Sequence, residues 1–171
     1  MKCLSNLWLL ICLPVICFAQ SSQNTNFTLP ECQIKTIDGN IISTSQLADT
    51  DEFSYVICFW QSCCSHNLNF MDAFNDLYEE ISEDMPFKVY AVSIDDSRTS
   101  GKVKSMVNGK GWLFDFYLDP NSDFKRAMNV SLTPHCFLFD TNGTLVWQKS
   151  AFLQGDEYLI EEALEKNQIN E

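Results

Sequence analysis

The sequence is poor in positive charge and has few long apolar runs. Its 171 residues carry 11 Lys and Arg against 23 Asp and Glu, a net charge of −12. Such a surface repels nucleic acid and anionic lipid, so we expect neither as a partner. After residue 19 no apolar segment reaches the length of a membrane-spanning helix, and no internal repeat, low-complexity tract or interdomain linker is found. We therefore expect one domain without an integral membrane segment.

The start of the chain has the pattern of a secretory signal peptide. Lys2 precedes an apolar stretch over about residues 7–18, and the small Ala19 follows as the expected cleavage position. A lipoprotein signal with Cys17 as the acylated residue is the weaker alternative, because the residue before it is bulky.

This pattern divides the chain into three parts. Residues 1–19 are the predicted signal peptide, residues 20–26 a polar, flexible N-terminus, and residues 27–167 the folded domain. We expect the mature protein to be exported, to either the periplasm or the extracellular space.

The chain also has too few cysteines for a disulfide framework. Without the signal peptide it keeps five, namely Cys32, Cys58, Cys63, Cys64 and Cys136. An odd number in an oxidising compartment leaves at least one thiol free, capped or shared between molecules. Because these cysteines cluster near one junction, a chemical role for them is an open option.

The apolar pattern alternates between strands and helices. Residues 53–59 are a continuous aromatic and β-branched run, which predicts a buried central strand, and three- and four-residue apolar spacing predicts a helix over 64–82. Asp38-Gly39 predicts a hairpin turn at the start, and the whole predicted order is hairpin, β, α, β, α, β, α, β, β, α. Alternating strands and helices imply parallel pairing, and the closing hairpin adds antiparallel strands. The sequence predicts an α/β fold whose central mixed sheet has helices on both faces.

Two adjacent cysteines, Cys63 and Cys64, lie where the predicted strand gives way to the helix. Unpaired amides and the helix dipole favour a thiolate there, and the thiolate is the nucleophile. An ordinary thiol is only about 3% ionised at pH 7, and a pKa lower by about two units, worth roughly 2.7 kcal/mol, would make it mostly thiolate. Which of the two cysteines benefits depends on the register of the helix.

The segment FWQSCCSHN, residues 59–67, resembles the FW-x-x-W-C-x-x-C segment of the thioredoxin superfamily. The likeness is to its exported TlpA/ResA-like branch of redoxin or AhpC/TSA-like proteins, and it extends over about residues 27–166. In this match Cys64 takes the nucleophilic position and Cys63 replaces the usual tryptophan. Asn67 stands where the resolving cysteine belongs, so the motif is C-x-x-N in place of C-x-x-C.

The resemblance implies a thioredoxin-like fold with an N-terminal β-hairpin and, over residues 114–128, an inserted strand–helix pair. It also implies that Thr133-Pro134 is the family's cis-proline turn, which lies beside the nucleophile and presents backbone to a substrate chain. Only about 5–6% of X–Pro bonds are cis, so this expectation rests on the resemblance. The activity implied is thiol–disulfide exchange with protein thiols or disulfides as substrates or redox partners, without a cofactor.

The replaced cysteine puts the usual dithiol activity in question. A dithiol reductase releases its product when the second cysteine attacks the mixed disulfide, and Asn67 cannot do this. In our leading hypothesis Cys136, Cys63 or an external thiol resolves the intermediate, and His66 is a candidate to stabilise the thiolate. A Cys63–Cys64 disulfide would be strained. Cys136 lies two residues past the proline and so on the same face of its strand, where it is either a resolving thiol or a small core residue.

Two further hypotheses come from other classes of function. The chain can be a non-catalytic binding module that kept the peptide-facing groove and lost turnover. It can also bind copper or zinc if Cys63, Cys64, His66, His135 and Cys136 converge. Against the metal hypothesis, His135 should point away from Cys136 across the strand, and no spacing matches a dedicated metal motif.

Overall fold

The computed structural model describes residues 27–48 and 52–170. The predicted signal peptide, residues 1–19, and the expected flexible N-terminus, residues 20–26, lie outside the described residues. Within the two described ranges, no helix is both long enough and apolar enough to cross a membrane.

The secondary structure follows the predicted order. The described residues form β1 (Gln33–Thr36), β2 (Ile41–Ser43), a 3-10 turn (Thr44–Leu47), β3 (Tyr55–Trp60), α1 (Ser65–Ile81), β4 (Lys88–Ser93), α2 (Ser100–Lys110), β5 (Asp115–Leu118), α3 (Asp123–Ala127), β6 (His135–Phe139), β7 (Leu145–Ser150) and α4 (Tyr158–Asn170). The predicted Asp38-Gly39 turn joins β1 to β2, and Gly39 has a φ of 91°, a conformation that side chains rarely adopt. The inserted strand–helix pair is β5 with α3.

The strands form one mixed sheet in the order β2-β1-β5-β4-β3-β6-β7. Strands β3, β4 and β5 run parallel, as the alternation of strands and helices predicts. Strand β6 pairs antiparallel with β3 and with β7, and β1 pairs antiparallel with β5 and β2. The central strand β3 therefore has a neighbour on each side, and its carboxyl end leads directly into α1.

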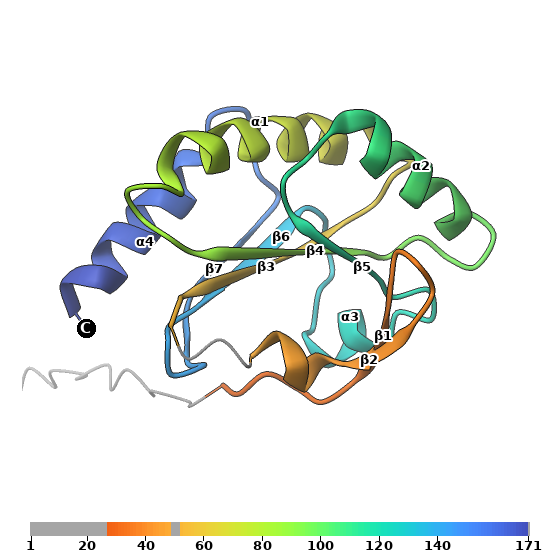
Figure 1. Cartoon of the computed structure of the whole chain (residues 1–171), viewed down its shortest axis with the longest axis horizontal. Helices are drawn as coiled ribbons and strands as arrows, with labels where there is room; N and C mark the ends of the chain where they lie inside the picture. The colour runs from red at the N-terminus through yellow and green to blue at the C-terminus, as the bar shows by residue number, and fades with distance from the viewer. Residues whose placement is uncertain (1–26, 49–51, 171) are drawn as a thin grey trace, which may run out of the picture.

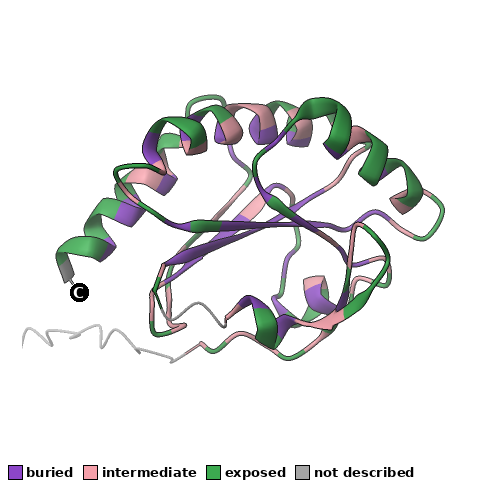
Figure 2. Cartoon of the chain, viewed as in Figure 1, coloured by how far each residue is buried: buried purple, intermediate pink, exposed green. Residues whose placement is uncertain are grey.

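Helices cover both faces of the sheet, as predicted. In Figure 1, α1, α2 and α4 lie on one face, and α3 lies on the other together with the 3-10 turn. Successive residues of β3 alternate between these two layers: Val56, Cys58 and Trp60 pack towards α1, whereas Ile57 and Phe59 pack towards α3. Figure 2 shows the central strands β3, β4 and β6 as the buried centre between these two layers.

The buried face of α1 fixes how the helix sits on the sheet. Its apolar residues recur at the helical spacing and are almost inaccessible, with Phe70, Met71, Phe74, Leu77 and Ile81 all at most 8% exposed. Burial of this row against β3 and β4 holds the first turn of α1 next to the end of β3. The packed core therefore holds the junction between β3 and α1 in place.

Candidate functional site

The junction between β3 and α1 is a four-residue loop that ends at Cys64. Trp60, the last residue of β3, is fully buried and packs edge-to-face against Trp112 at 5.5 Å between ring centroids. Cys64 is the N-cap of α1 with an extended backbone, and its carbonyl accepts the first helical hydrogen bond, from the N–H of Leu68 at 3.1 Å. The Cys64 side chain therefore lies beside the amides of the first turn, which have no partner within the helix.

These amides lower the pKa of the Cys64 thiol. The pKa of the Cys64 thiol is lowered chiefly by a hydrogen bond from the backbone N–H of Asn67, then by the Asn67 side chain, and to a smaller degree by the N–H of His66. Partial burial of the thiol acts in the opposite direction. Cys63 is exposed to solvent. The helix register thus favours Cys64 as the nucleophile.

Asn67 occupies the centre of the site. Its side chain is 1% exposed, although it replaces a cysteine of the motif. The Asn67 Oδ1 accepts from the N–H of Gln61 at 3.1 Å, and Nδ2 donates to the carbonyl oxygen of Thr133 at 3.4 Å. Because an amide nitrogen carries two hydrogens, the same group also stabilises the Cys64 thiolate. Sequence reasoning saw here only a missing thiol, whereas the structure shows a bridge between the loop, the sulfur and the proline turn.

The Thr133–Pro134 peptide bond is cis, as the resemblance predicts. Pro134 is buried, and the Asn67 bond to Thr133 connects this turn to the first turn of α1. On its other side, the carbonyl oxygen of Pro134 accepts from the N–H of Ala151 at 3.2 Å. The turn therefore lies between the thiol-bearing helix and the loop that follows β7.

Asp95 is hydrogen-bonded to the loop between β3 and α1, a contact that sequence reasoning did not predict. It follows β4, is 1% exposed, and accepts from the N–H of Ser62 at 2.9 Å, from Ser62 Oγ at 2.7 Å and from Ser93 Oγ at 2.7 Å. The next residue, Asp96, is the one that accepts from the N–H groups of Arg98 and Thr99 at the start of the following helical segment. The sequence does contain a signal for Asp95, because two acidic residues follow the buried strand and only one of them is needed to cap the next helix.

Cys136 is buried on the face of the sheet that α1, α2 and α4 cover. It faces Cys58 across the β3–β6 pair, and both side chains are 0% exposed. The Cys58 Sγ lies 3.9 Å from the Met71 Sδ. Burial raises the pKa of the Cys136 thiol well above its usual value, and its hydrogen bond with Cys58 adds to this effect. Of the two roles considered for Cys136, the structure matches the core residue.

The two histidines do not join a common cluster with the cysteines. His66 is exposed in the first turn of α1. His135 stacks on Phe137 at 4.2 Å between centroids, on the face of β6 opposite to Cys136, and burial lowers its pKa against a hydrogen bond with Gln148 that raises it. The part of the chain that the structure describes contains no group of three or more His, Cys, Asp or Glu suited to a metal ion. The convergence of these five residues, on which the copper or zinc hypothesis depends, is therefore not found among the described residues.

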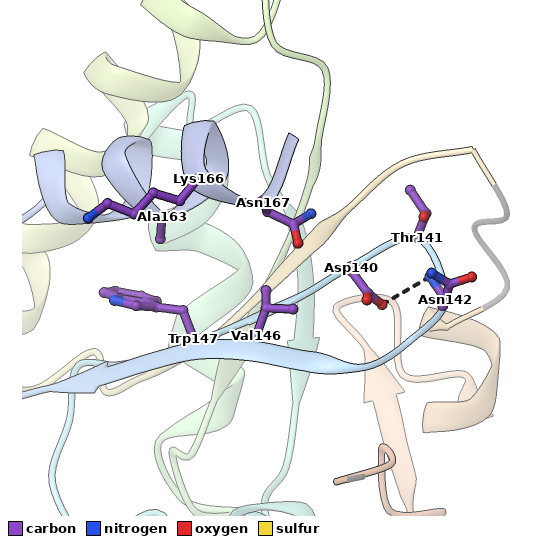
Figure 3. A pocket seen from close by; sticks show the side chains of 8 residues that line it. All are labelled: Asp140, Thr141, Asn142, Val146, Trp147, Ala163, Lys166 and Asn167. Carbon is purple, nitrogen blue, oxygen red and sulfur yellow. Dashed lines mark hydrogen bonds between the residues drawn. The ribbon is translucent and has the colours of Figure 1, made fainter. Parts of the chain in front are cut away.

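Two hollows differ in their relation to this site. One, of about 570 Å³, lies between α4 and the β6–β7 hairpin, where Trp147 and Val146 face Ala163 and Lys166 (Figure 3). It sits at the far end of β6 from Pro134 and is lined by neither cysteine nor histidine. The other, of about 440 Å³, includes in its wall His66, which lies two residues after Cys64 in the chain.

Comparisons with known proteins agree with this geometry. The model of the AhpC/TSA family matches residues 23–148. The solution structure of an uncharacterized thioredoxin-like protein from Porphyromonas gingivalis is 34% identical with a TM-score of 0.71, over 82% of this chain and 92% of that one. No curated protein matches the chain.

Two more distant structures share the fold. An exposed lipoprotein thioredoxin from Streptococcus pneumoniae is 19% identical with a TM-score of 0.63, over 80% of this chain and 99% of that one. A thiol-disulfide oxidoreductase from Bacteroides fragilis is 16% identical with a TM-score of 0.63, over 80% of this chain and 97% of that one. At these identities the comparison establishes a common thioredoxin-like architecture.

Proposed function

This chain belongs to the AhpC/TSA family and has a thioredoxin-like fold, and on that premise we propose that it exchanges thiols and disulfides through one nucleophilic cysteine, Cys64. The substrates are protein thiols and disulfides. The observation that carries the proposal is the position of Cys64: its thiol has a lowered pKa and is hydrogen-bonded by Asn67, which also contacts the cis-proline turn.

The first step is attack of the Cys64 thiolate on one sulfur of a substrate disulfide. A new S–S bond forms to Cys64 while the substrate S–S bond breaks, and the released substrate thiolate takes a proton from water. The substrate chain lies along Thr133-Pro134 during this step. The product is a mixed disulfide between Cys64 and the substrate. The number of disulfide bonds is the same before and after this step.

The second step uses an external thiol. Its thiolate attacks the substrate sulfur of the mixed disulfide. A disulfide forms between the external thiol and the substrate, and Cys64 leaves as a thiolate. A low pKa makes Cys64 a good leaving group as well as a nucleophile. The two internal candidates considered are poorly suited to this role, and Asn67 has no thiol: Cys63 would close a strained ring with its neighbour, and Cys136 is buried with a raised pKa.

The test is a comparison of single-cysteine substitutions in reaction with a small chromogenic aromatic disulfide at pH 7. We expect wild-type protein and Cys63→Ser to release the chromogenic thiol at similar rates, and Cys64→Ser to lose the reaction. If Cys64→Ser reacts as fast as wild type, the mechanism is wrong. The variant Asn67→Cys tests the second step, because a restored internal thiol should prevent the mixed disulfide from accumulating.

A non-catalytic binding module is the second candidate function, favoured by the absence of a second thiol at position 67. Under that alternative, a partner is still captured after Cys64→Ser, and Cys64 is alkylated slowly at pH 7. The exchange mechanism gives the opposite result in both measurements.

Export of the protein belongs to the same proposal. It is supported by the signal-like residues 1–19 and by the likeness to an exposed lipoprotein from another organism. Mass spectrometry of the protein recovered from the cell envelope should show a mature N-terminus at Gln20. An intact chain that begins at Met1 inside the cell would contradict export.

A further inference from the structure

A hollow of about 440 Å³ lies between the first two turns of α1 and the loop that joins β7 to α4. We call it the His66–Glu157 hollow. Its wall on α1 contains His66, Phe70 and Ala73, and its wall on the loop contains Phe152, Leu153 and Glu157.

Both walls of the hollow are attached to the thiol site. On one side, the backbone N–H of His66 contributes to the lowered pKa of the Cys64 thiol two residues away. On the other side, the loop begins at Ala151, whose N–H donates to the carbonyl oxygen of Pro134 at 3.2 Å. The two walls are thus continuous, through His66 and Ala151, with the thiol and the proline turn where the substrate disulfide is proposed to react.

The floor of the hollow is apolar. Phe70 is 5% exposed and Phe152 is 0% exposed, and their ring centroids lie 4.3 Å apart. Leu153, in contrast, is 72% exposed on the rim of the hollow. This arrangement suits a side chain with an aliphatic stem.

The charge of the hollow is negative. Glu157 is the one carboxylate in its lining, which includes no Lys or Arg, and Glu157 Oε2 accepts from the N–H of Gly155 at 3.0 Å. The nearby cation Lys149, whose Nζ lies 5.7 Å from the ring centroid of Phe152, is paired with Asp156 at 3.3 Å and is not itself part of the lining. The whole chain carries 23 acidic against 11 basic side chains, which attracts a basic partner.

We propose that the His66–Glu157 hollow binds a Lys or Arg side chain of the polypeptide whose disulfide reacts at Cys64. The stem of that side chain lies on Phe70, Phe152 and Leu153, and its charged end reaches Glu157. This assignment rests on the proposed exchange through Cys64 and names the substrate class: disulfides flanked by basic residues. In an extended substrate, residues two places from the cysteine share its side and lie about 6.6 Å along the chain, so these positions point towards the protein surface near Cys64.

The experiment uses three peptides that differ only in charge. Each carries one cysteine as a mixed disulfide with a chromogenic aromatic thiol, and the residues two places on either side are Arg, Leu or Glu. The release rate is measured with wild-type protein, with Glu157→Gln and with Glu161→Gln. Glu161 is the matched control, because it carries the same charge four residues later, in the first turn of α4 and outside the lining of the hollow.

We expect wild-type protein to react with the Arg peptide roughly two- to fivefold faster than with the Leu peptide, the size of one partly exposed ion pair, and slowest with the Glu peptide. Glu157→Gln should abolish the advantage of Arg over Leu, whereas Glu161→Gln should keep it. Added salt should reduce the advantage.

Several outcomes would overturn the assignment. Equal rates for Arg and Leu, a Leu peptide that reacts fastest, or an Arg advantage that survives Glu157→Gln each show that the hollow does not select a cation. A small aromatic disulfide without a peptide separates the two proposals. If it reacts at Cys64 in all variants while the peptide series shows no order, only the hollow assignment fails; if it does not react at all, the exchange mechanism fails and the assignment falls with it.

Discussion

Cys64 and Cys136 lie on either side of the same proline turn, yet their environments drive their chemistry in opposite directions. Cys64 is half-buried at the start of α1, where the amides of His66 and Asn67 lower its pKa. Cys136 is buried two residues past Pro134, where desolvation and Cys58 raise its pKa. The comparison teaches that access to unpaired N–H donors separates a reactive thiol from an inert one.

The difference follows from the two kinds of secondary structure. In a sheet each N–H of β6 is already bonded to β3 or β7, so a sulfur on that strand meets only other side chains. At a helix start the first N–H groups have no carbonyl partner, and an anion can take them. Cysteines near one turn can therefore differ widely without any nearby cation.

The largest expected effect is the gap in alkylation rate between these cysteines in the native protein. Iodoacetamide at pH 7 should modify Cys64, while Cys58 and Cys136 react only through opening of the core. Unfolding of a domain costs about 5–15 kcal/mol, so their rates should be lower than that of Cys64 by roughly a thousandfold or more. Peptide mapping by mass spectrometry at successive times measures each site.

The exposed Cys63 serves as the internal reference for this experiment. Because it is exposed, it should be alkylated far faster than the buried Cys136, and we expect it to react behind Cys64. Alkylation of Cys136 at a rate close to that of Cys63 would mean that the sheet opens readily, and the contrast between the two sites would be broken.

A smaller effect is expected for the stability of the core around Cys136. Cys136→Ser places a hydroxyl among apolar groups, which should lower the free energy of unfolding by about 1–3 kcal/mol. Cys63→Ser is the matched control, because the same change at an exposed position should stay within about 0.5 kcal/mol. Urea unfolding followed by circular dichroism measures both.

The same pair of variants tests whether Cys136 takes part in the exchange reaction. We expect both to react with a small disulfide through Cys64 at the wild-type rate once they are folded. A slower release of the bound thiol in Cys136→Ser alone would identify Cys136 as the resolving thiol that the geometry argues against.

The sequence was sufficient to predict the elements that position Cys64. The apolar run over residues 53–59 and the helical spacing that follows locate the junction, and the cis bond before Pro134 was expected from the resemblance. These features depend on local pattern or on a motif that many chains share.

The hydrogen-bond partners at the site could not be predicted in the same way. Asp95 contacts Ser62 across 33 residues and Asn67 contacts Thr133 across 66, so each contact requires the packed sheet that brings the segments together. A buried Asn and a buried Asp also look like surface residues in a sequence. Their burial follows from satisfied hydrogen bonds, which pattern alone does not reveal.

Cys64 and Cys136 also affect the pH dependence of the free energy of unfolding in opposite directions. The folded-state pKa of Cys64 lies below that of an unfolded cysteine, so the folded protein holds the thiolate more favourably. This contribution is fully present above the unfolded-state pKa and is lost as the pH falls through the folded-state pKa. For Cys136 the folded-state pKa is raised, so its contribution is present at lower pH and is lost as the pH rises above the unfolded-state pKa.

The smallest expected effect comes from the Asn67 side chain, which contributes to the lowered pKa of Cys64. Asn67→Ala keeps the backbone N–H that chiefly lowers the Cys64 pKa and removes the side-chain contribution to it, together with the side-chain bonds to Gln61 and Thr133. One such bond is worth about 0.5–1.5 kcal/mol, so the alkylation rate of Cys64 at pH 7 should fall roughly two- to tenfold, and the rate–pH curve should move to higher pH. Asn69→Ala, an exposed position on the same helix, should leave the curve in place. Because the thiol is fully ionised at high pH in every variant, the rates should converge there; a difference that persists at high pH would assign Asn67 to access or geometry instead of to the thiolate.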